Sequence, residues 1–475
     1  MADSFYWYDF ETFGTHPGLD RPSQFAGVRT DANLQPVGEE LLIYNQLTDD
    51  YLPQPEACRV TGIGPSEVNQ KGLREYQFIQ KIHAELTSPN TCLVGYNSIR
   101  FDDEFTRYTL FRNFYDPYEH EWKNGNSRWD LLDVVRLTRA LRPNGIEWPL
   151  HPDGKPSNRL EDLTAANGIG HLNAHDALAD VHATIAVARL IRDAQPKLFD
   201  YALAHRTKAA ANTALNLREQ NPVLHISGML PGEYGHAAIV APITRLTHNR
   251  NGVVVFDLRA DPAELADLDA EAIRQRVFTP KIDMPEGINR LPLKTVHVNR
   301  SPVLVPLSTL DDASAERLQI NKAESLKHLE TLRNLPNLND KIIEALKPQD
   351  RDTDNDVDGS LYSGGFFSDS DKRKFTTIRS LTGTQLSEHK DLFDDPRVDE
   401  MLFRYRARNW PDSLNEDESR RWTEHRKHYV NTNVDNQQRL ALYNATIEGL
   451  EWPEHQQALK QDLLAWGQSM SKITA

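Results

Sequence analysis

The spacing of apolar and polar residues divides the chain into three regions. In the first region, aromatic-rich or alternating runs predict strands, and apolar residues at three- and four-residue steps predict helices. Strands are expected at residues 5–11, 24–29, 40–47 and 91–96, and helices at 73–86, 102–114, 130–141, 160–167 and 176–194. The first three strands follow one another closely and predict an antiparallel meander. Pro196 is expected to close this α/β region.

The second region returns to strand-like patterns and is followed by a helical third region. Its strands are expected at residues 223–229, 237–244, 252–258 and 296–305, which predicts a small β-barrel or sandwich, with helices at 313–318 and 324–346. An acidic stretch with few apolar residues, 349–359, indicates a domain boundary. We therefore expect an α/β domain at 1–196, a β-rich domain with helices at 197–348, an acidic linker at 349–367 and an all-α domain at 368–475.

Composition supports a folded protein of several domains. The 475 residues are 39% hydrophobic and 26% charged, as in ordinary globular chains, and about 150 residues per domain suggests about three domains. Two cysteines are too few for a disulfide framework or a four-cysteine zinc site. No apolar run reaches the roughly 18 residues of a membrane span, and the start lacks a signal peptide pattern. We therefore expect a cytoplasmic protein with no membrane partner.

The net charge of −15 has two interpretations. Taken over the whole molecule, it disfavours binding to a polyanion such as nucleic acid. An excess of acids is also what an enzyme shows when it gathers carboxylates around divalent metal ions. Charge alone therefore does not identify the partner.

Asp9 and Glu11 are the first candidates for chemistry, because alternation along a strand places both carboxylates on one face. Acid-x-acid pairs should occur about (69/475)² × 473 ≈ 10 times by chance in this chain, so the pair by itself fits a solvated strand face. Its neighbours Tyr8 and Phe10 are large and apolar, however. They predict a core strand, in which carboxylates are costly unless they have a task.

Asp102, His175 and Asp180 each have an ordinary structural explanation. Asp102 could be the N-cap of the helix that it begins or a first-turn acid favoured by the helix dipole. The helix at 176–194 could be capped by Asn173 or Asp176 beside a surface histidine. Taken together with Asp9 and Glu11, the same residues suit two Mg²⁺ ions that stabilise the attacking and leaving oxygens of a phosphoryl displacement. His175 would be the general base, since its ordinary pKa near 6.5 lets it take a proton at neutral pH.

The motifs that contain these residues resemble a known family. The segments YDFET (8–12), GYN (95–97) with FD (101–102), and NAHDA (173–177) with Asp180 are similar to the three exonuclease motifs of the histidine branch of the DEDD superfamily. The total length, the segments DFETFGTHP (9–17) and LFRYRARN (402–409), and the β-rich middle with a helical end extend the resemblance to the bacterial exonuclease I family. The resemblance therefore covers the whole chain.

The resemblance implies a fold and an activity. The expected fold is an α/β ribonuclease H-like exonuclease domain, a Src-homology-3-like β-barrel domain and an all-α C-terminal domain that together clamp single-stranded DNA. The expected reaction is Mg²⁺-dependent hydrolysis in the 3′→5′ direction that releases 5′-mononucleotides, in DNA repair and recombination. By transfer, Asp9, Glu11 and Asp180 hold metal, Asp102 supports the second of two ions, and His175 is the general base.

Further residues are assigned to DNA and protein contacts. Glu11, Thr12 and Phe13 are expected to touch the terminal nucleotide. Three arginines near the Asp102 motif are expected to contact phosphates: Arg100, Arg107 and Arg128. The family also implies binding to the acidic C-terminal tail of single-stranded DNA-binding protein, with Arg142 and Tyr201 as receptor residues, and a monomeric state.

Other interpretations stay open at this point. The same site would serve a 3′→5′ exoribonuclease, although such enzymes are short chains, or the protein could be a catalytically silent clamp on single-stranded DNA.

Residues 403–410 interleave arginines with aromatic rings, but without the resemblance we favour a helix that buries its rings and pairs its arginines with acids. The acidic stretch begins like a calcium loop, but Gly365 stands where a glutamate is needed. His175-Asp176 also matches the doublet of HD-type phosphohydrolases, with His171 and His182 available, but that interpretation gives Asp9, Glu11 and Asp102 no role.

Overall fold

The computed structural model describes residues 3–170, 176–348, 356–390, 392–434 and 436–472. These residues form two compact units. The first unit consists of the described residues within 2–126, 171–182 and 353–475, and the second of those within 127–170 and 183–352. The first unit thus joins most of the N-terminal region to the C-terminal helices.

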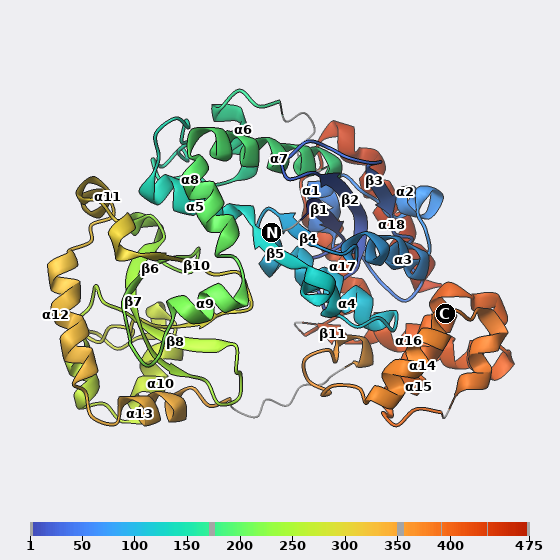
Figure 1. Cartoon of the computed structure of the whole chain (residues 1–475). Coiled ribbons are helices and arrows are strands. Elements are labelled where there is room, and N and C mark those ends of the chain that lie inside the picture. The colour runs from blue at the N-terminus through green and yellow to red at the C-terminus, as the bar shows by residue number, and fades with distance from the viewer. Residues whose placement is uncertain (1–2, 171–175, 349–355, 391, 435, 473–475) are drawn as a thin grey trace. The chain divides into compact units, whose positions relative to one another are not determined.

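A sheet of the first unit carries the N-terminal motifs (Figure 1). Strand β1 (Ser4–Thr12) pairs antiparallel with β2 (Pro22–Thr30), and β2 pairs antiparallel with β3 (Leu41–Tyr44). On its other edge β1 pairs in parallel with β4 (Thr91–Gly95). The expected meander is therefore confirmed, and a parallel strand lies beside it.

Helices cover this sheet through an apolar core. Helix α3 (Glu75–Leu86) places Phe78, Ile79 and Ile82 against Phe10 and Phe25 of the sheet. Helix α4 (Asp102–Arg112) follows β4 after a short turn. The two short helices α1 (Pro55–Thr61) and α2 (Pro65–Lys71) were not expected, because their seven-residue length gives a weak periodic signal. Each begins with a proline in its first turn, where the missing N–H costs nothing.

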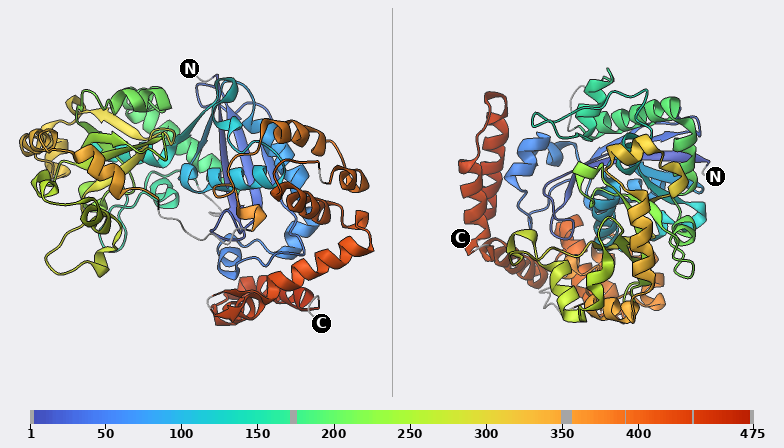
Figure 2. Two further views of the ribbon diagram at one scale, coloured as in Figure 1. Left: turned by 90° about the horizontal axis from the view of Figure 1, so that it is seen from below. Right: turned by 90° about the vertical axis from the view of Figure 1, so that its left-hand side faces the viewer.

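The C-terminal helices pack against this α/β part within the same unit. They are α14 (Asp369–Ile378), α15 (Arg397–Asn409), α16 (Glu416–Asn431), α17 (Arg439–Gly449) and α18 (Gln457–Ser471). A short hairpin precedes α17, formed by the two-residue strands β11 (Asn433–Val434) and β12 (Gln437–Gln438). Figure 2 shows the red helix α18 beside the blue helices α1 and α2, and a shared apolar cluster that includes Cys58, Val68 and Leu463 lies between them.

The second unit contains a curled antiparallel sheet. Its strands run in the order β10-β6-β7-β8-β9, with bounds Val303–Pro306, Val223–Ile226, Ala237–Arg245, Gly252–Asp257 and Leu293–His297. Helices α9 (Lys208–Ala214), α10 (Ala270–Phe278), α12 (Lys322–Arg333) and α13 (Leu338–Ala345) surround it (Figure 1). The unit also holds β5 (Ser127–Asp130), α5 (Leu131–Leu141), α6 (Leu160–Ala166), α8 (Pro196–Ala204) and α11 (Asp312–Arg317).

Two expectations about this unit were wrong, for local reasons. The strand expected at 296–305 is two strands, β9 and β10, separated by a turn in which Ser301 has a φ of 45°. The helix expected at 324–346 breaks into α12 and α13 at Pro336 and Asn337, whose φ is 55°. Pro196 starts helix α8, because proline suits a first helical turn, and the domain boundary at this residue stays a prediction.

Candidate active site

Strand β1 presents Asp9 and Glu11 on one face and buries its other face. Across the antiparallel ladder Asp9 is paired with Ala26 and Glu11 with Gln24, so these four side chains share a face. Tyr8 and Phe10, which alternate with these acids along the strand, are each 3% exposed and belong to the core beneath. The period-two pattern of the sequence therefore places the two carboxylates as expected.

Asp102 reaches the same strand from the first turn of helix α4. Its Oδ1 accepts a hydrogen bond of 3.0 Å from the backbone N–H of Phe10, the residue between Asp9 and Glu11. That N–H lies beyond the parallel ladder of β1 and β4, which ends at the pair Trp7 and Val94. Asp102 is not the N-cap, a position that Phe101 occupies, but it is an acid of the first helical turn, as the other half of the structural explanation expected.

Asp180 completes the carboxylate cluster from helix α7 (Ala177–Ala194). Carboxylate oxygens of Asp9, Glu11 and Asp180 all lie within 4.8 Å of one another. Oxygen ligands about 2.1 Å from one Mg²⁺ ion are separated by about 3 to 4 Å, so small side-chain adjustments suffice for one divalent ion to bind all three. The donor set, which is only carboxylate oxygen, fits a hard divalent cation.

The electrostatics of the cluster favour a bound cation. Burial, followed by the negative charges of Asp102, Glu11 and Asp180, raises the pKa of Asp9 well above its usual value. Burial and the charges of Asp180, Asp102 and Asp176 raise the pKa of Glu11 to about 9. Like charges in a buried site repel one another, and a divalent cation would relieve this repulsion.

His175, the expected general base, lies outside the described residues, as does His171. Asp176 directly follows and caps α7, with Oδ1 accepting from the N–H groups of Leu178 at 3.1 Å and Ala179 at 3.3 Å. The capping expectation is thus correct for Asp176. His182, the other histidine considered for an HD-type site, forms a 3.0 Å contact with Glu40 in a half-exposed position.

The residues expected to touch the terminal nucleotide follow Glu11 into a tight loop. The Thr12 side chain donates a 2.6 Å hydrogen bond to the carbonyl of Gly14. The Phe13 ring is only 1% exposed and packs in the apolar cluster with Tyr51 and Leu52. This burial does not support a contact between the Phe13 ring and a nucleotide, so the assignment stays a prediction for both residues.

The three arginines near the Asp102 motif differ in their surroundings. Arg107 is buried between Glu104 and Glu121, with closest N–O distances of 2.7 and 2.6 Å. Although burial acts in the opposite direction, Glu121 and the neighbouring acids raise its pKa. Arg128 is buried in the second unit and donates to the carbonyl of Asn299 at 2.8 Å. Arg100 is exposed, so phosphate contact fits its position better than those of the other two.

Arg142 and Tyr201, the expected receptor residues, both belong to the second unit. Arg142 forms a partly exposed ion pair of 3.2 Å with Asp311 and donates to the carbonyl of Thr309 at 3.1 Å. Tyr201 donates to the carbonyl of Leu304 at 3.2 Å, and its ring stacks on His205 at a centroid distance of 3.9 Å. Tyr201 also lines a small pocket with residues of β10. Their role in partner binding stays a prediction.

The arginine-rich helix α15 has the structural role favoured by its residues alone. Arg404 contacts Glu400 and Asp356, and Arg408 contacts Asp50 and Asp358. Arg406 pairs with Glu418, while Phe403 and Tyr405 are buried. The aspartates of the calcium-like stretch, Asp356 and Asp358, are therefore bound to arginines of α15.

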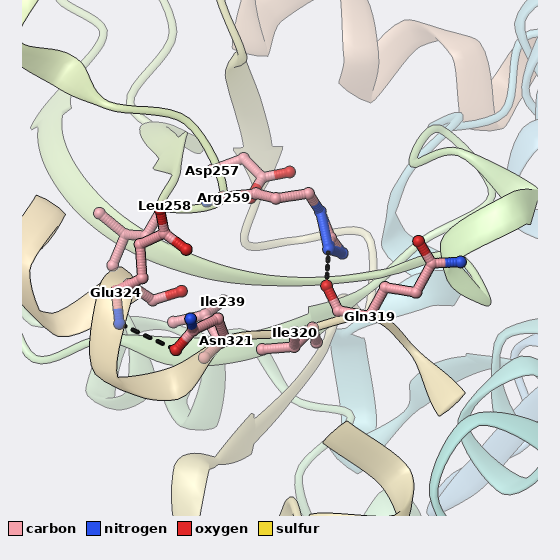
Figure 3. A pocket seen from close by; sticks show the side chains of 9 residues that line it. Ile239, Asp257, Leu258, Arg259, Gln319, Ile320, Asn321 and Glu324 are labelled. Carbon is pink, nitrogen blue, oxygen red and sulfur yellow. Dashed lines mark hydrogen bonds between the residues drawn. The ribbon is translucent and has the colours of Figure 1, made fainter. Parts of the chain in front are cut away.

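The second unit has another polar pocket, which contains no predicted site residue (Figure 3). Arg259 donates to the backbone carbonyl of Gln319 at 3.1 Å, and Asn321 accepts from the N–H of Glu324 at 3.1 Å as the cap of α12. The bond from Arg259 joins the turn before α12 to the segment after β8, and the bond to Asn321 is local to the start of α12. We therefore interpret the pocket as part of the helix-to-sheet packing.

Sequence reasoning missed two polar residues next to the carboxylates. Asp103 is 1% exposed and accepts a hydrogen bond from the Tyr8 hydroxyl. Gln24 is 1% exposed and lies directly opposite Glu11. The register of the first two strands could have identified Gln24, because a residue opposite a metal ligand shares its face. Asp103 offered no such signal, since it is a second acid in a helix start.

Family models match almost the whole chain. Residues 6–188 match the model described as Exonuclease, 206–348 the Exonuclease I SH3-like domain, and 355–470 the Exonuclease I C-terminal domain. Among curated proteins, exodeoxyribonuclease I of Haemophilus influenzae is 44% identical over 462 residues, covering 94% of this chain and 98% of that protein. Exodeoxyribonuclease I of Escherichia coli is 46% identical over 428 residues, covering 90% of each chain.

Solved structures show the same similarity in three dimensions. Exonuclease I from Methylocaldum szegediense is similar with a TM-score of 0.92 and 46% identity, over 99% of this chain and 100% of that one. E. coli exonuclease I in complex with a dA16 oligonucleotide has a TM-score of 0.92 and 43% identity, over 99% of both chains. A structure of SSB/exonuclease I with an inhibitor has a TM-score of 0.89 and 41% identity over the full length of both chains. None of the helices among the described residues is long and apolar enough to cross a membrane.

Proposed function

The chain belongs to the bacterial exonuclease I family of single-stranded DNA exonucleases, and we propose that it removes nucleotides from the 3′ end with two Mg²⁺ ions and releases 5′-mononucleotides. The observation that carries this proposal is the partly buried cluster of Asp9, Glu11 and Asp180, with Asp102 bonded to the same strand. An exonuclease domain of this kind depends on divalent metal. The enzyme would act in DNA repair and recombination.

The cluster accounts for the metal-binding part of the reaction. Asp9, Glu11 and Asp180 would hold metal, and Asp102 would support the second ion. When bound, two such ions stabilise the attacking and leaving oxygens of a phosphodiester displacement. The chain's contribution is to hold four carboxylates in a fixed arrangement, because the Phe10 N–H fixes Asp102 beside the strand that carries Asp9 and Glu11.

His175 is proposed as the general base. An imidazole with a pKa near 6.5 is largely neutral at physiological pH and can accept a proton from the attacking water. Its position in the sequence, one residue before the cap of α7 and five before Asp180, supports this role. The assignment rests on the motif, since His175 lies outside the described residues.

The rival exoribonuclease would use the same carboxylates. Single-stranded DNA is favoured because the similar curated proteins are named exodeoxyribonucleases and because related enzymes have been solved with DNA oligonucleotides. The silent-clamp alternative is disfavoured because the four described carboxylates of the catalytic set are present and three of them converge.

A protein partner is also proposed. A relative has been solved together with single-stranded DNA-binding protein, so binding to that protein's acidic C-terminal tail is expected for this chain. Arg142 offers a half-exposed guanidinium and Tyr201 an aromatic wall of a small pocket, which suit an acidic tail with an apolar end. A monomeric enzyme in the cytoplasm completes this proposal.

Product analysis tests the proposed reaction. Purified protein would be given Mg²⁺ and 5′-labelled DNA and RNA oligonucleotides, each single-stranded or duplex, with Asp180→Ala as the blank. We expect a ladder that shortens from the 3′ end on single-stranded DNA alone and disappears when the metal is chelated. Preferential cleavage of RNA would favour the exoribonuclease, and binding without cleavage would favour the clamp.

A further inference from the structure

Gln24 occupies a central position beside the carboxylate cluster. It lies on β2 directly opposite Glu11, and its side chain is on the face that carries Asp9 and Glu11. The residue is 1% exposed. A buried amide costs free energy unless its polar atoms form hydrogen bonds, so the contacts of Gln24 indicate what it stabilises.

The amide oxygen of Gln24 binds the start of helix α7. It accepts a hydrogen bond of 3.0 Å from the backbone N–H of Ala177, the first residue of that helix. This donor has no partner inside the helix, because the first N–H groups of any α-helix lack a preceding carbonyl. Ala177 itself is fully buried.

The remaining first-turn donors of α7 are satisfied from Asp176. Its side chain accepts from Leu178 and Ala179, and its carbonyl accepts from the N–H of Asp180 at 3.0 Å. These three bonds are local to the helix start. Of these four hydrogen bonds at the start of α7, the one that Gln24 accepts joins the helix to the sheet.

We propose that Gln24 is a positioning residue of the metal centre. It holds the start of α7 against β2 and thereby sets the distance of Asp180 from Asp9 and Glu11. Asp180 follows Ala177 by three residues, about 4.5 Å along the helix axis, so movement of the first turn carries the carboxylate with it. The inference rests on the proposed function in that Asp180 must be a metal ligand.

Metal binding without DNA is the direct test. Gln24→Met keeps the length of the side chain and removes the acceptor, whereas Gln24→Glu keeps an acceptor oxygen at the same atom. Titration calorimetry with Mn²⁺ should show a dissociation constant about tenfold or more higher in Gln24→Met, the usual size of effect for a group that orients a metal ligand. Gln24→Glu should bind Mn²⁺ at least as well as the parent enzyme.

Thr30→Val is a matched control on the same strand. Thr30 is fully buried and accepts a hydrogen bond of 2.9 Å from the Trp7 indole, which also joins β1 and β2. Loss of this hydrogen bond in Thr30→Val should lower thermal stability about as much as Gln24→Met does and leave Mn²⁺ affinity unchanged. An equal loss of affinity in Thr30→Val and Gln24→Met, or no loss in Gln24→Met, would overturn the positioning role.

Two further results keep the test decisive. If Gln24→Met does not fold, hydrogen exchange of the parent enzyme replaces it: the Ala177 amide should be protected, and rapid exchange there would contradict the proposal. Asp180→Ala distinguishes a failure of the proposed metal centre from a failure of the positioning role of Gln24. If its Mn²⁺ affinity equals that of the parent, the proposed metal centre itself fails; if it loses affinity while Gln24→Met does not, only the positioning role fails.

Discussion

Two carboxylate clusters in the same unit have opposite electrostatic surroundings. At the candidate active site, burial and neighbouring acids raise the pKa of Asp9 and Glu11. Beside helix α15, Asp50 and Asp358 are buried as well, and although burial acts to raise their pKa values, Arg408 and the neighbouring cations hold them below the usual value. Buried carboxylates that face arginines are structural, whereas buried carboxylates that face one another indicate a cation-binding site.

The same comparison explains why the arginines of α15 suit packing better than phosphate binding. Arg404, Arg406 and Arg408 are largely buried and engaged by acids from α15, from α16 and from two other segments. An arginine that already pairs with two aspartates has little capacity left for a phosphate. The interleaving of rings and cations therefore reflects packing here.

The largest expected effect is at the cluster of acids. Asp180→Asn should abolish hydrolysis of single-stranded DNA, a loss on the order of 10³ or more in rate, because a metal ligand is removed. Its thermal unfolding temperature should not fall, since one of several mutually repelling charges is lost. Initial rates and a melting curve measure both quantities. Retained activity would contradict the assignment of Asp180.

Removing the cation from the second cluster should act on stability instead. Arg408→Met leaves Asp50 and Asp358 buried without their main partner, and breaking such a pair costs roughly 3 to 5 kcal/mol of unfolding free energy. Urea unfolding measures this change. The control Arg420→Met breaks the exposed pair with Asp417 and should change stability by less than about 1 kcal/mol. Similar effects of both variants would show that burial of the pair is unimportant.

A smaller effect is expected at the proposed base. His175→Ala should lower turnover by about 10² and leave Mn²⁺ affinity near that of the parent, because general-base catalysis contributes roughly 10² to 10⁴. Steady-state rates across pH 5 to 9 provide the measurement. An unchanged acidic limb of the pH-rate profile in His175→Ala would argue against the base role.

The smallest predicted effect is a dependence of stability on pH. The folded pKa values of Asp50 and Asp358 are depressed, so their stabilising contribution is present above the unfolded value of about 4 and is lost as pH falls below it. Urea midpoints of the parent should therefore decline between about pH 5 and pH 3. Arg408→Met should show a shallower decline, because its aspartates have lost their main cation. Parallel curves for the two proteins would contradict this explanation.

The strands and the metal-binding pair could be predicted because their signals are local. Alternation alone places Asp9 and Glu11 on one face of β1, and the motif resemblance added Asp102 and Asp180. The family comparisons confirm the fold class and the exonuclease function.

What could not be predicted depends on partners distant in sequence. Arg107 was expected to contact phosphate because no local feature of the sequence shows that it forms an ion pair with Glu121. The contact between Gln24 and Ala177 spans 153 residues and depends on strand register. Helix α8 was missed because its starting proline, Pro196, was interpreted as the end of a region, and the seven-residue helix α1 was missed because it gives a weak periodic signal.

The central claim is that the carboxylates that face one another, Asp9, Glu11 and Asp180, bind the catalytic metal. Crystals of the full chain soaked in Mn²⁺ and measured at the manganese absorption edge test it most directly. The account predicts anomalous peaks among Asp9, Glu11 and Asp180 and beside Asp102, with none at Asp356 and Asp358. Peaks at Asp356 and Asp358, or no peaks at Asp9 and Glu11, would contradict this claim.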